Sequence, residues 1–167
     1  MAKQITDREF EVIIYENQPL ILKICSLYTS TESDKEDLFQ EIVINLWKGI
    51  HGFKGNSQLS TWIYKVGLNT AISRSRKQKK NKLFYTAAVP DIAGPQSDPY
   101  NDQIRALYQA IDKLKPAEKA IVLLYLEDKS YEEISEIVGI SKSNVSVKLV
   151  RLKRKLEKLI KPKQVKN

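Results

Sequence analysis

The strongest constraint on the fold is a stretch near the C-terminus, residues 130–160, that combines two helix caps with a glycine between them. Ser130 and Glu133 form a capping box, which predicts that a helix begins there. Gly139 follows the last apolar residue of that short helix, where a left-handed backbone would end it. Ser141 can then cap a second, longer helix. This order of elements predicts a helix-turn-helix unit.

The longer helix has two different faces. One face is an apolar stripe at intervals of four, three, four and three residues: Val145, Leu149, Leu152, Leu156 and Leu159. The other face carries Lys142, Ser143, Ser146, Val147, Val150, Arg151 and Arg154, flanked by Lys148, Lys153 and Lys155. Residues 141–167 hold ten Lys or Arg against one acid. Short polar residues near base edges with cations behind them favour a DNA major groove; a solvated basic helix closing a bundle is the alternative.

The overall charge also favours an anionic partner. The 167 residues include 28 Lys or Arg against 20 Asp or Glu, a balance typical of proteins that bind nucleic acid or membrane surfaces. No run of 18 apolar residues is present, and the first residues lack the apolar segment of a signal peptide. The single cysteine, Cys25, excludes an internal disulfide and is expected to be a buried thiol. We therefore expect a cytoplasmic protein with no membrane insertion.

The N-terminal half predicts a series of capped helices. Thr6 with Glu9 forms one capping box, Pro19 stands near the start of a second helix, and Ser33 with Glu36 forms a capping box for a third. In this third helix, which ends near residue 50, an apolar face is expected from Leu38, Ile42 and Leu46, widened by Phe39, Val43 and Trp47. Its polar strip consists of Asp37, Gln40, Glu41 and Asn45.

A fourth helix is predicted over residues 58–80, after a glycine-containing loop. Its core stripe consists of Leu59, Ile63, Val66 and Thr70. A second stripe combines an aromatic, an amide and cations: Trp62, Lys65, Asn69, Ser73 and Arg76. The helix ends in a basic run, Arg74, Arg76, Lys77, Lys79, Lys80 and Lys82. These side chains favour a platform for single-stranded nucleic acid; in the alternative, Trp62 belongs to the core and the basic run is only a solvated face.

Residues 83–101 lack a helical period and contain three of the six prolines, which predicts a linker. Helix is expected to resume at Asp102 and again at Pro116, and the helix after Pro116 should pack beneath the helix-turn-helix through Ile121, Val122, Leu124 and Tyr125. The predicted fold class is therefore all-α, with two small helical domains at 1–82 and 102–161. Residues 162–167 form a basic tail.

Catalytic and cofactor motifs are missing from the sequence. One histidine, His51, and one cysteine cannot build an ordinary zinc site. The phosphate-binding patterns GxxxxGK and GxGxxG and the nucleophile pattern GxSxG are absent. No pair of acids is placed as metal ligands for a nuclease or recombinase. We therefore expect neither an enzyme nor a cofactor.

Three segments together resemble a known family. DLFQEIVINLWKGI, FKGNSQLSTWIYKVGLNTAISRSR and KLKPAEKAIVLLYLEDKSYEEISEIVGISKSNVSVKLVRLKRKL are similar to the extracytoplasmic-function (ECF) type sigma factors of bacterial RNA polymerase, in the sigma-70 family. The resemblance implies a region 2 domain and a region 4 domain that dock on the beta and beta-prime subunits of the polymerase core. It implies that region 2 melts the minus-ten promoter element and that region 4 reads the minus-thirty-five element. The linker would run near the polymerase active cleft and RNA exit path.

The resemblance also implies contacts for individual residues. Polymerase binding falls on Asp37, Leu38, Gln40 and Glu41. Binding of minus-ten DNA, including a base flipped out of the single strand, falls on Phe53, Lys54, Gly55, Asn56, Trp62, Lys65, Asn69, Arg74 and Arg76. Binding of minus-thirty-five duplex falls on Lys142, Ser143, Asn144, Ser146, Val147, Lys148, Arg151 and Arg154. Many relatives have an arginine in place of Ser146 and a small polar residue in place of Val147, so Arg151 and Lys148 are expected to contribute more. An anti-sigma protein, common in the family, is a further candidate partner.

Two other classes of function compete with this reading. A free-standing helix-turn-helix repressor would use the first domain for dimerisation or ligand binding. Such a domain would not need the basic and aromatic stripe that includes Trp62, Lys65 and Asn69. A recombinase or other DNA-processing enzyme would need the metal-binding acids that the sequence does not supply.

Overall fold

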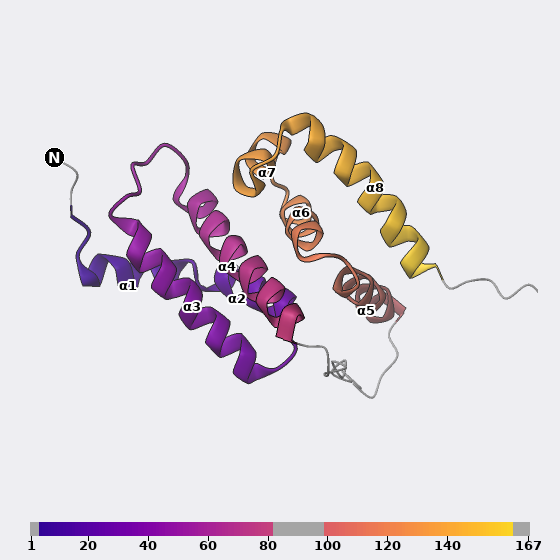
Figure 1. Ribbon diagram of the computed structural model, residues 1–167, viewed down its shortest axis with the longest axis horizontal. Helices are drawn as coiled ribbons and strands as arrows, with labels where there is room; N and C mark the ends of the chain where they lie inside the picture. The colour runs from indigo at the N-terminus through magenta and orange to yellow at the C-terminus, as the bar shows by residue number, and fades with distance from the viewer. Residues whose placement is uncertain (1–3, 82–98, 162–167) are drawn as a thin grey trace, which may run out of the picture. The chain divides into compact units, whose positions relative to one another are not determined.

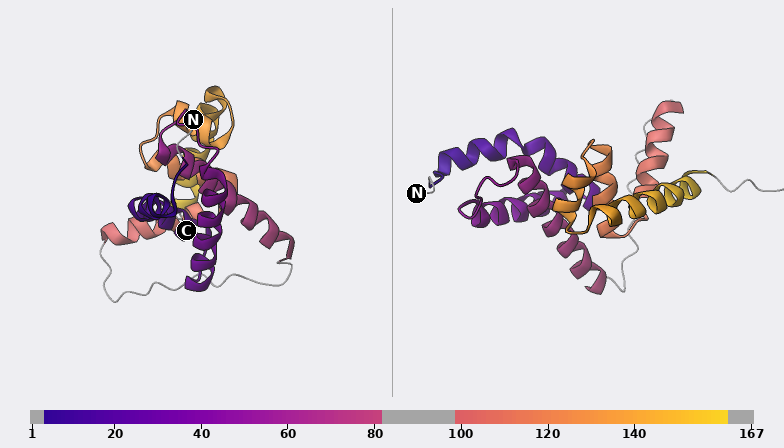
Figure 2. Two further views of the ribbon diagram at one scale, coloured as in Figure 1. Left: turned by 90° about the vertical axis from the view of Figure 1, so that its left-hand side faces the viewer. Right: turned by 90° about the horizontal axis from the view of Figure 1, so that it is seen from above.

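The computed structural model describes residues 4–81 and 99–161, and within these residues every regular element is an α-helix (Figure 1). The helices fall into two compact units, α1–α4 and α5–α8. Two further views show the helical character of each unit from other sides (Figure 2). The predicted all-α class with two helical domains is therefore confirmed.

The first unit consists of α1 (Asp7–Glu16), α2 (Gln18–Tyr28), α3 (Glu32–Ile50) and α4 (Leu59–Asn81). The capping box predicted at the start of α1 is present: the Glu9 N–H donates to Thr6 Oγ1 at 3.3 Å, and the Thr6 N–H donates to Glu9 Oε2 at 2.9 Å. A proline stands in the first turn of α2, also as predicted.

The start of α3 differs from the prediction. Ser33 and Glu36 do not form the expected capping box, because Ser33 already lies inside the helix. The cap is Thr31, whose backbone is extended and whose Oγ1 accepts a hydrogen bond from the Asp34 N–H at 3.1 Å. Thr31 and Ser33 each carry a hydroxyl close enough to the start of α3 to serve as its cap. Thr31 has the extended backbone that a cap requires, and Thr29, just after α2, donates its hydroxyl to the Cys25 carbonyl at 2.6 Å.

The core of the first unit lies among α2, α3 and α4, with α3 and α4 side by side (Figure 1). Its fully buried side chains include Ile21, Ile24, Leu38, Ile42, Leu46, Ile63 and Leu68. Gly67 allows α4 to approach α2 closely, since a Cβ at this position would lie 2.8 Å from Ile24 Cδ1. The buried hydroxyl of Thr70 accepts from Asn45 Nδ2 at 2.9 Å and donates to the Val66 carbonyl at 2.8 Å. Close packing and a satisfied polar pair therefore hold α4 in register with its neighbours.

The second unit consists of α5 (Pro99–Asp112), α6 (Pro116–Leu126), α7 (Tyr131–Val138) and α8 (Lys142–Ile160). Helix α5 begins three residues before the predicted start at Asp102. Proline is well suited to a first helical turn, because its φ is already helical and its missing N–H would have no partner there. The last three residues of the predicted linker are therefore helical. Residues 82–98 of the predicted first domain and linker and the tail at 162–167 lie outside the described residues.

The core of the second unit forms where α8 packs on α5, α6 and α7. Leu159, at the end of the predicted α8 stripe, is half-buried. The other four residues of the stripe are buried: Val145, Leu149, Leu152 and Leu156. In α6, Ile121, Val122 and Leu124 are buried as predicted, but the expectation for Tyr125 was wrong. Tyr125 is 38% exposed, and Lys153 Nζ lies 4.4 Å from the centroid of its ring. An aromatic ring near a helix end can pack against a cation and remain partly exposed.

Candidate nucleic-acid interface

The helix-turn-helix predicted from the sequence is present in the second unit. Ser130 Oγ accepts from the Glu133 N–H at 3.1 Å, and the Ser130 N–H donates to Glu133 Oε2 at 2.8 Å, which fixes the start of α7. Gly139 ends α7 with a left-handed backbone, φ 78°. Ser141 Oγ then accepts from the Asn144 N–H at 3.2 Å to begin α8. Local hydrogen bonds thus set the turn that orients α8.

The outward face of α8 presents polar and cationic side chains to solvent. All of the residues predicted to contact duplex DNA are exposed: Lys142, Ser143, Asn144, Ser146, Val147, Lys148, Arg151 and Arg154. Lys142 forms an ion pair with Glu132 of α7, and the hydrogen bond from Lys142 lowers the pKa of Glu132. In the part of the chain that the structure describes, Lys148, Arg151 and Arg154 have no acidic partner within ion-pair distance. These three cations are therefore available to phosphates.

Two of the three flanking lysines of α8, Lys153 and Lys155, turn back toward α6. Lys153 lies over Tyr125, and Lys155 Nζ lies 3.2 Å from Glu118 Oε2. Burial opposes the charge of Glu118, but the hydrogen bonds from the Lys115 N–H and from Lys155 outweigh it and lower the pKa of this carboxyl. These contacts brace α8 against α6. Lys153 and Lys155 thus contact α6, whereas Lys148, Arg151 and Arg154 face solvent.

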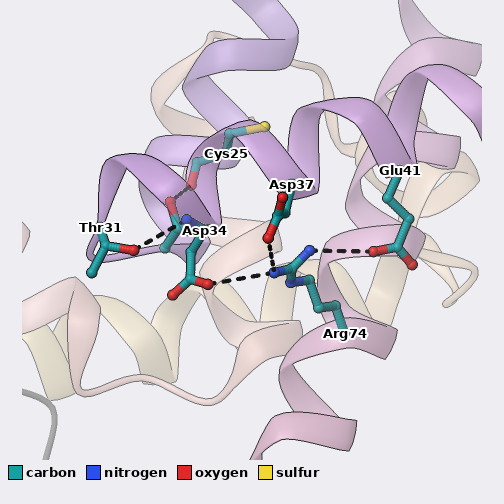
Figure 3. Close-up of polar contacts among 7 residues, drawn as sticks. Cys25, Thr31, Asp34, Asp37, Glu41 and Arg74 are labelled. Atoms are coloured by element: carbon teal, nitrogen blue, oxygen red, sulfur yellow. Dashed lines mark hydrogen bonds and ion pairs between the residues drawn. The ribbon is translucent and has the colours of Figure 1, made fainter.

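In the first unit, Arg74 of α4 faces three carboxylates of α3 (Figure 3). Its guanidinium lies 3.6 Å from Asp34 Oδ1, 4.0 Å from Asp37 Oδ2 and 3.5 Å from Glu41 Oε2. The side chain of Arg74 is 19% exposed, so little of it is open to a ligand. Arg74 was predicted among the minus-ten contacts, but in this structure its charge is directed at α3.

Three of the four residues predicted for the polar strip of α3 are exposed, whereas Asn45 is half-buried and donates to Thr70 of α4. Asp37, Gln40 and Glu41 all lie at the surface, and Asp37 and Glu41 have Arg74 as a partner from another helix. Leu38, which was predicted to bind polymerase with them, is 1% exposed and belongs to the core. A leucine in the apolar stripe of a packed helix cannot offer its side chain to a partner. The surface strip therefore consists of the three polar residues.

A shallow concavity beside this strip had no signal in the sequence, because two helices build it. Its volume is ≈ 400 Å³, and its lining residues are Gln18, Leu22, Glu32, Lys35, Glu36, Phe39 and Gln40.

Cys25 of α2 (Figure 3) is fully buried, as predicted. Burial raises the pKa of its thiol to about 11, although the positive charges of Lys35 and Arg74 act in the opposite direction. The thiol is therefore protonated at neutral pH.

The second stripe of α4 begins at an aromatic pair. The rings of Phe53 and Trp62 lie 5.3 Å apart between centroids, and Trp62 is half-buried. Gly49 packs against it, since a Cβ there would lie 3.2 Å from Trp62 Cζ2. Trp62 thus combines the two roles considered for it, with one part packed and one part at the surface. The other predicted minus-ten residues on the loop and along α4 are exposed: Lys54, Gly55, Asn56, Lys65, Asn69 and Arg76.

No described helix combines the length and apolar character needed to cross a bilayer. No cluster of three or more His, Cys, Asp or Glu side chains suited to a metal ion occurs in the described part of the chain.

Sequence comparison identifies the family of both units. The profile for sigma-70 region 2 matches residues 13–81, and the profile for sigma-70 region 4 matches residues 104–156. The sigma factor SigV of Bacillus subtilis is 27% identical over 150 residues, which cover 89% of this chain and 89% of SigV. The ECF sigma-E factor of Haemophilus influenzae is 25% identical over an alignment of 188 positions, which covers 97% of this chain and 99% of the relative.

Solved structures agree on the fold. The sigma factor RpoE of Bartonella quintana, in complex with the anti-sigma factor NepR, has a TM-score of 0.71 at 21% identity and covers 94% of this chain and 99% of its own. CnrH, in complex with the cytosolic domain of CnrY, has a TM-score of 0.67 at 17% identity and covers 93% of this chain and 89% of its own. Since the two family profiles match the two structural units in order, this chain belongs to the sigma-70 family of RNA polymerase sigma factors and is of the ECF type.

Proposed function

We propose that this sigma factor binds the RNA polymerase core through the polar strip of α3, opens the minus-ten element with α4 and its preceding loop, and holds the minus-thirty-five element with α8. The supporting observation is that each unit has its own exposed polar or cationic surface. The first unit exposes Asp37, Gln40 and Glu41 on one helix and Lys65 and Asn69 on another, while the second unit exposes the cations of α8. A repressor would need only the last of these surfaces.

In this proposal the polymerase carries out the catalysis, and the sigma factor acts with it in the cytoplasm without being an enzyme itself.

The Bartonella quintana relative was solved with an anti-sigma factor, and we propose a protein inhibitor of that class for this chain too. Such an inhibitor should lower transcription by the reconstituted holoenzyme when it is added in stoichiometric amounts. A candidate that leaves transcription unchanged would not be the inhibitor.

The deciding experiment is transcription by purified core polymerase with and without this chain, on a library of random promoter sequences. We expect transcripts only with the chain present, and a shared sequence pattern upstream of their start sites. A repressor would bind duplex DNA without supporting any transcription. A recombinase would instead cleave or join the DNA when a divalent metal is supplied.

The assignment of α3 is tested by Gln40→Ala combined with Glu41→Gln. These changes remove one amide and one negative charge from the strip without placing a new cation opposite Arg74, which a charge reversal at Glu41 would do. We expect core affinity to fall about tenfold, ~1.4 kcal/mol, with unchanged helix content. Glu11→Gln, at an exposed position of α1, is the matched control and should bind core normally. Normal core affinity of the double variant would exclude α3 from the interface.

A further inference from the structure

Two exposed valines lie in the middle of the outward face of α8. Val147 is 48% exposed and Val150 is 49% exposed. Ser143, Val147, Val150 and Arg154 follow one another at intervals of four, three and four residues, the same intervals as the buried stripe that begins at Val145. The two series are displaced by two residues, which is about 200° around a helix of 3.6 residues per turn. The valines therefore point almost directly away from the core of the second unit.

Single exposed apolar side chains are common on protein surfaces and need no explanation. These two differ because they are neighbours on one helix face and because cations surround them. Lys148 and Arg151 follow them directly in sequence, Arg154 lies one turn beyond, and none of the three has an acidic partner among the described residues. A small apolar patch inside a basic rim complements a polyanion that has an apolar group at its centre.

The major groove of DNA contains such a group. Its edges carry hydrogen-bond donors and acceptors, and its one large apolar feature is the C5-methyl group of thymine. Phosphates line both sides of the groove, where long cationic side chains can reach them. A protein surface that is apolar in the middle and cationic at its margins thus matches a thymine-containing groove better than it matches an apolar protein partner.

The neighbours of the valines also allow the close approach that short side chains require. Valine reaches only one carbon beyond Cβ, so it can touch a base only if the helix backbone lies deep in the groove. Ser143 and Ser146 are small, and Lys142 is drawn toward Glu132 of α7. Apart from Asn144 and the flanking Lys148, the outward side chains in the first two turns of α8 are therefore short or drawn aside, which allows a close approach to the groove.

We propose that Val147 and Val150 contact thymine methyl groups in the minus-thirty-five element, so that region 4 selects thymine at one or two positions by apolar contact. This inference rests on the proposed placement of α8 in the major groove, and it adds the chemistry by which the helix distinguishes bases. The cations supply affinity that does not depend on sequence, and the valines supply part of the selectivity.

The test removes only the methyl group. Wild-type holoenzyme first selects its preferred upstream duplexes from a random library, and each thymine in the selected element is then replaced by uracil. Uracil keeps every hydrogen-bonding group of thymine. At the contacted positions we expect wild-type affinity to fall about fourfold per methyl, which is ~0.8 kcal/mol. Uracil at other positions should have no effect.

The variants Val147→Ala and Val150→Ala complete a double-mutant cycle with these duplexes. Each variant should bind the thymine duplex with about the affinity that wild type has for the uracil duplex. When the matching thymine is replaced by uracil, the affinity of the variant should not fall further. Alanine favours helix more than valine does, so both variants should fold, and circular dichroism checks this. Arg154→Ala is the matched control on the same face and should weaken binding to the thymine and uracil duplexes by the same factor.

The outcomes separate the inference from the proposed function. If wild-type holoenzyme binds thymine and uracil duplexes equally at every position, or if the valine variants remain sensitive to the methyl, the methyl contact is wrong while promoter-directed transcription still holds. If changes at Arg154 and at both valines leave duplex binding unaltered, α8 does not lie on the DNA. In that case the proposed role of α8 also fails.

Discussion

At the scale of single residues, Arg74 has the most informative environment. Asp34, Asp37 and Glu41 lie on the same side of α3 and would repel one another without a cation between them. Arg74 comes from α4 and meets all three (Figure 3). Arg76, two residues later, is exposed at the surface. The two arginines stand in the same basic run, and their positions relative to α3 give them different roles.

This difference predicts opposite results for two alanine substitutions. Arg74→Ala should lower the free energy of unfolding of the first unit by about 1 kcal/mol, because a partly buried cation that contacts several carboxylates is removed. The loss should shrink in high salt, which screens the exposed carboxylates. Arg76→Ala should change stability by less than about 0.5 kcal/mol. Urea unfolding at low and high salt measures both, and equal losses for the two variants would contradict the internal role of Arg74.

At the scale of elements, the turn between α7 and α8 sets the orientation of the outward face of α8, which the proposed function places on DNA. The Ser130 capping box and the Ser141 cap fix the two helix starts, and Ser135 Oγ donates to the Ile140 carbonyl at 2.5 Å across the turn. The remaining requirement is the left-handed backbone at Gly139. All of these interactions are local, so the helix-turn-helix depends little on the rest of the chain for its internal geometry.

Substitution of Gly139 should therefore reveal a conformational cost without a clash. A Cβ at this position meets no heavy atom within 4 Å. Gly139→Ala should nevertheless destabilise the second unit by about 1 kcal/mol, because L-residues disfavour a left-handed backbone. Gly139→Asn should cost less, since asparagine tolerates that conformation better. Thermal unfolding compares the two variants, and an alanine variant as stable as wild type would show that the turn relaxes to another conformation.

At the scale of the whole molecule, a sigma factor must do more than bind a duplex. In the proposed function it also holds a melted strand, and the exposed residues of α4 beside the Phe53 and Trp62 pair are the candidates for that task. Aromatic rings stack on bases, and an amide can hydrogen-bond a base edge. Asn69 is the most direct probe of this surface because it is exposed and its removal should barely affect stability, within about 0.5 kcal/mol.

Asn69→Ala should slow promoter opening by reconstituted holoenzyme while core binding stays intact. The variant should also bind less tightly to a template whose minus-ten region is already melted, because strand capture itself is weakened. Lys148→Ala provides the contrast: it should weaken binding to upstream duplex but leave capture of a melted template without that duplex unchanged. If Asn69→Ala opens and transcribes both templates at wild-type rates, Asn69 does not hold a flipped base.

The sequence by itself determined the all-α class, the helix-turn-helix and the buried stripe of α8. Caps, a glycine stop and a helical period each involve residues within about one turn of one another, so they can be recognised before any tertiary contact is known. Only the tertiary structure decided that Thr31 rather than Ser33 caps α3, that Arg74 turns to the α3 carboxylates, and that Tyr125 stays at the surface beneath Lys153. Most of these outcomes depend on the distance and orientation between helices that are far apart in sequence, and local periodicity does not encode those quantities.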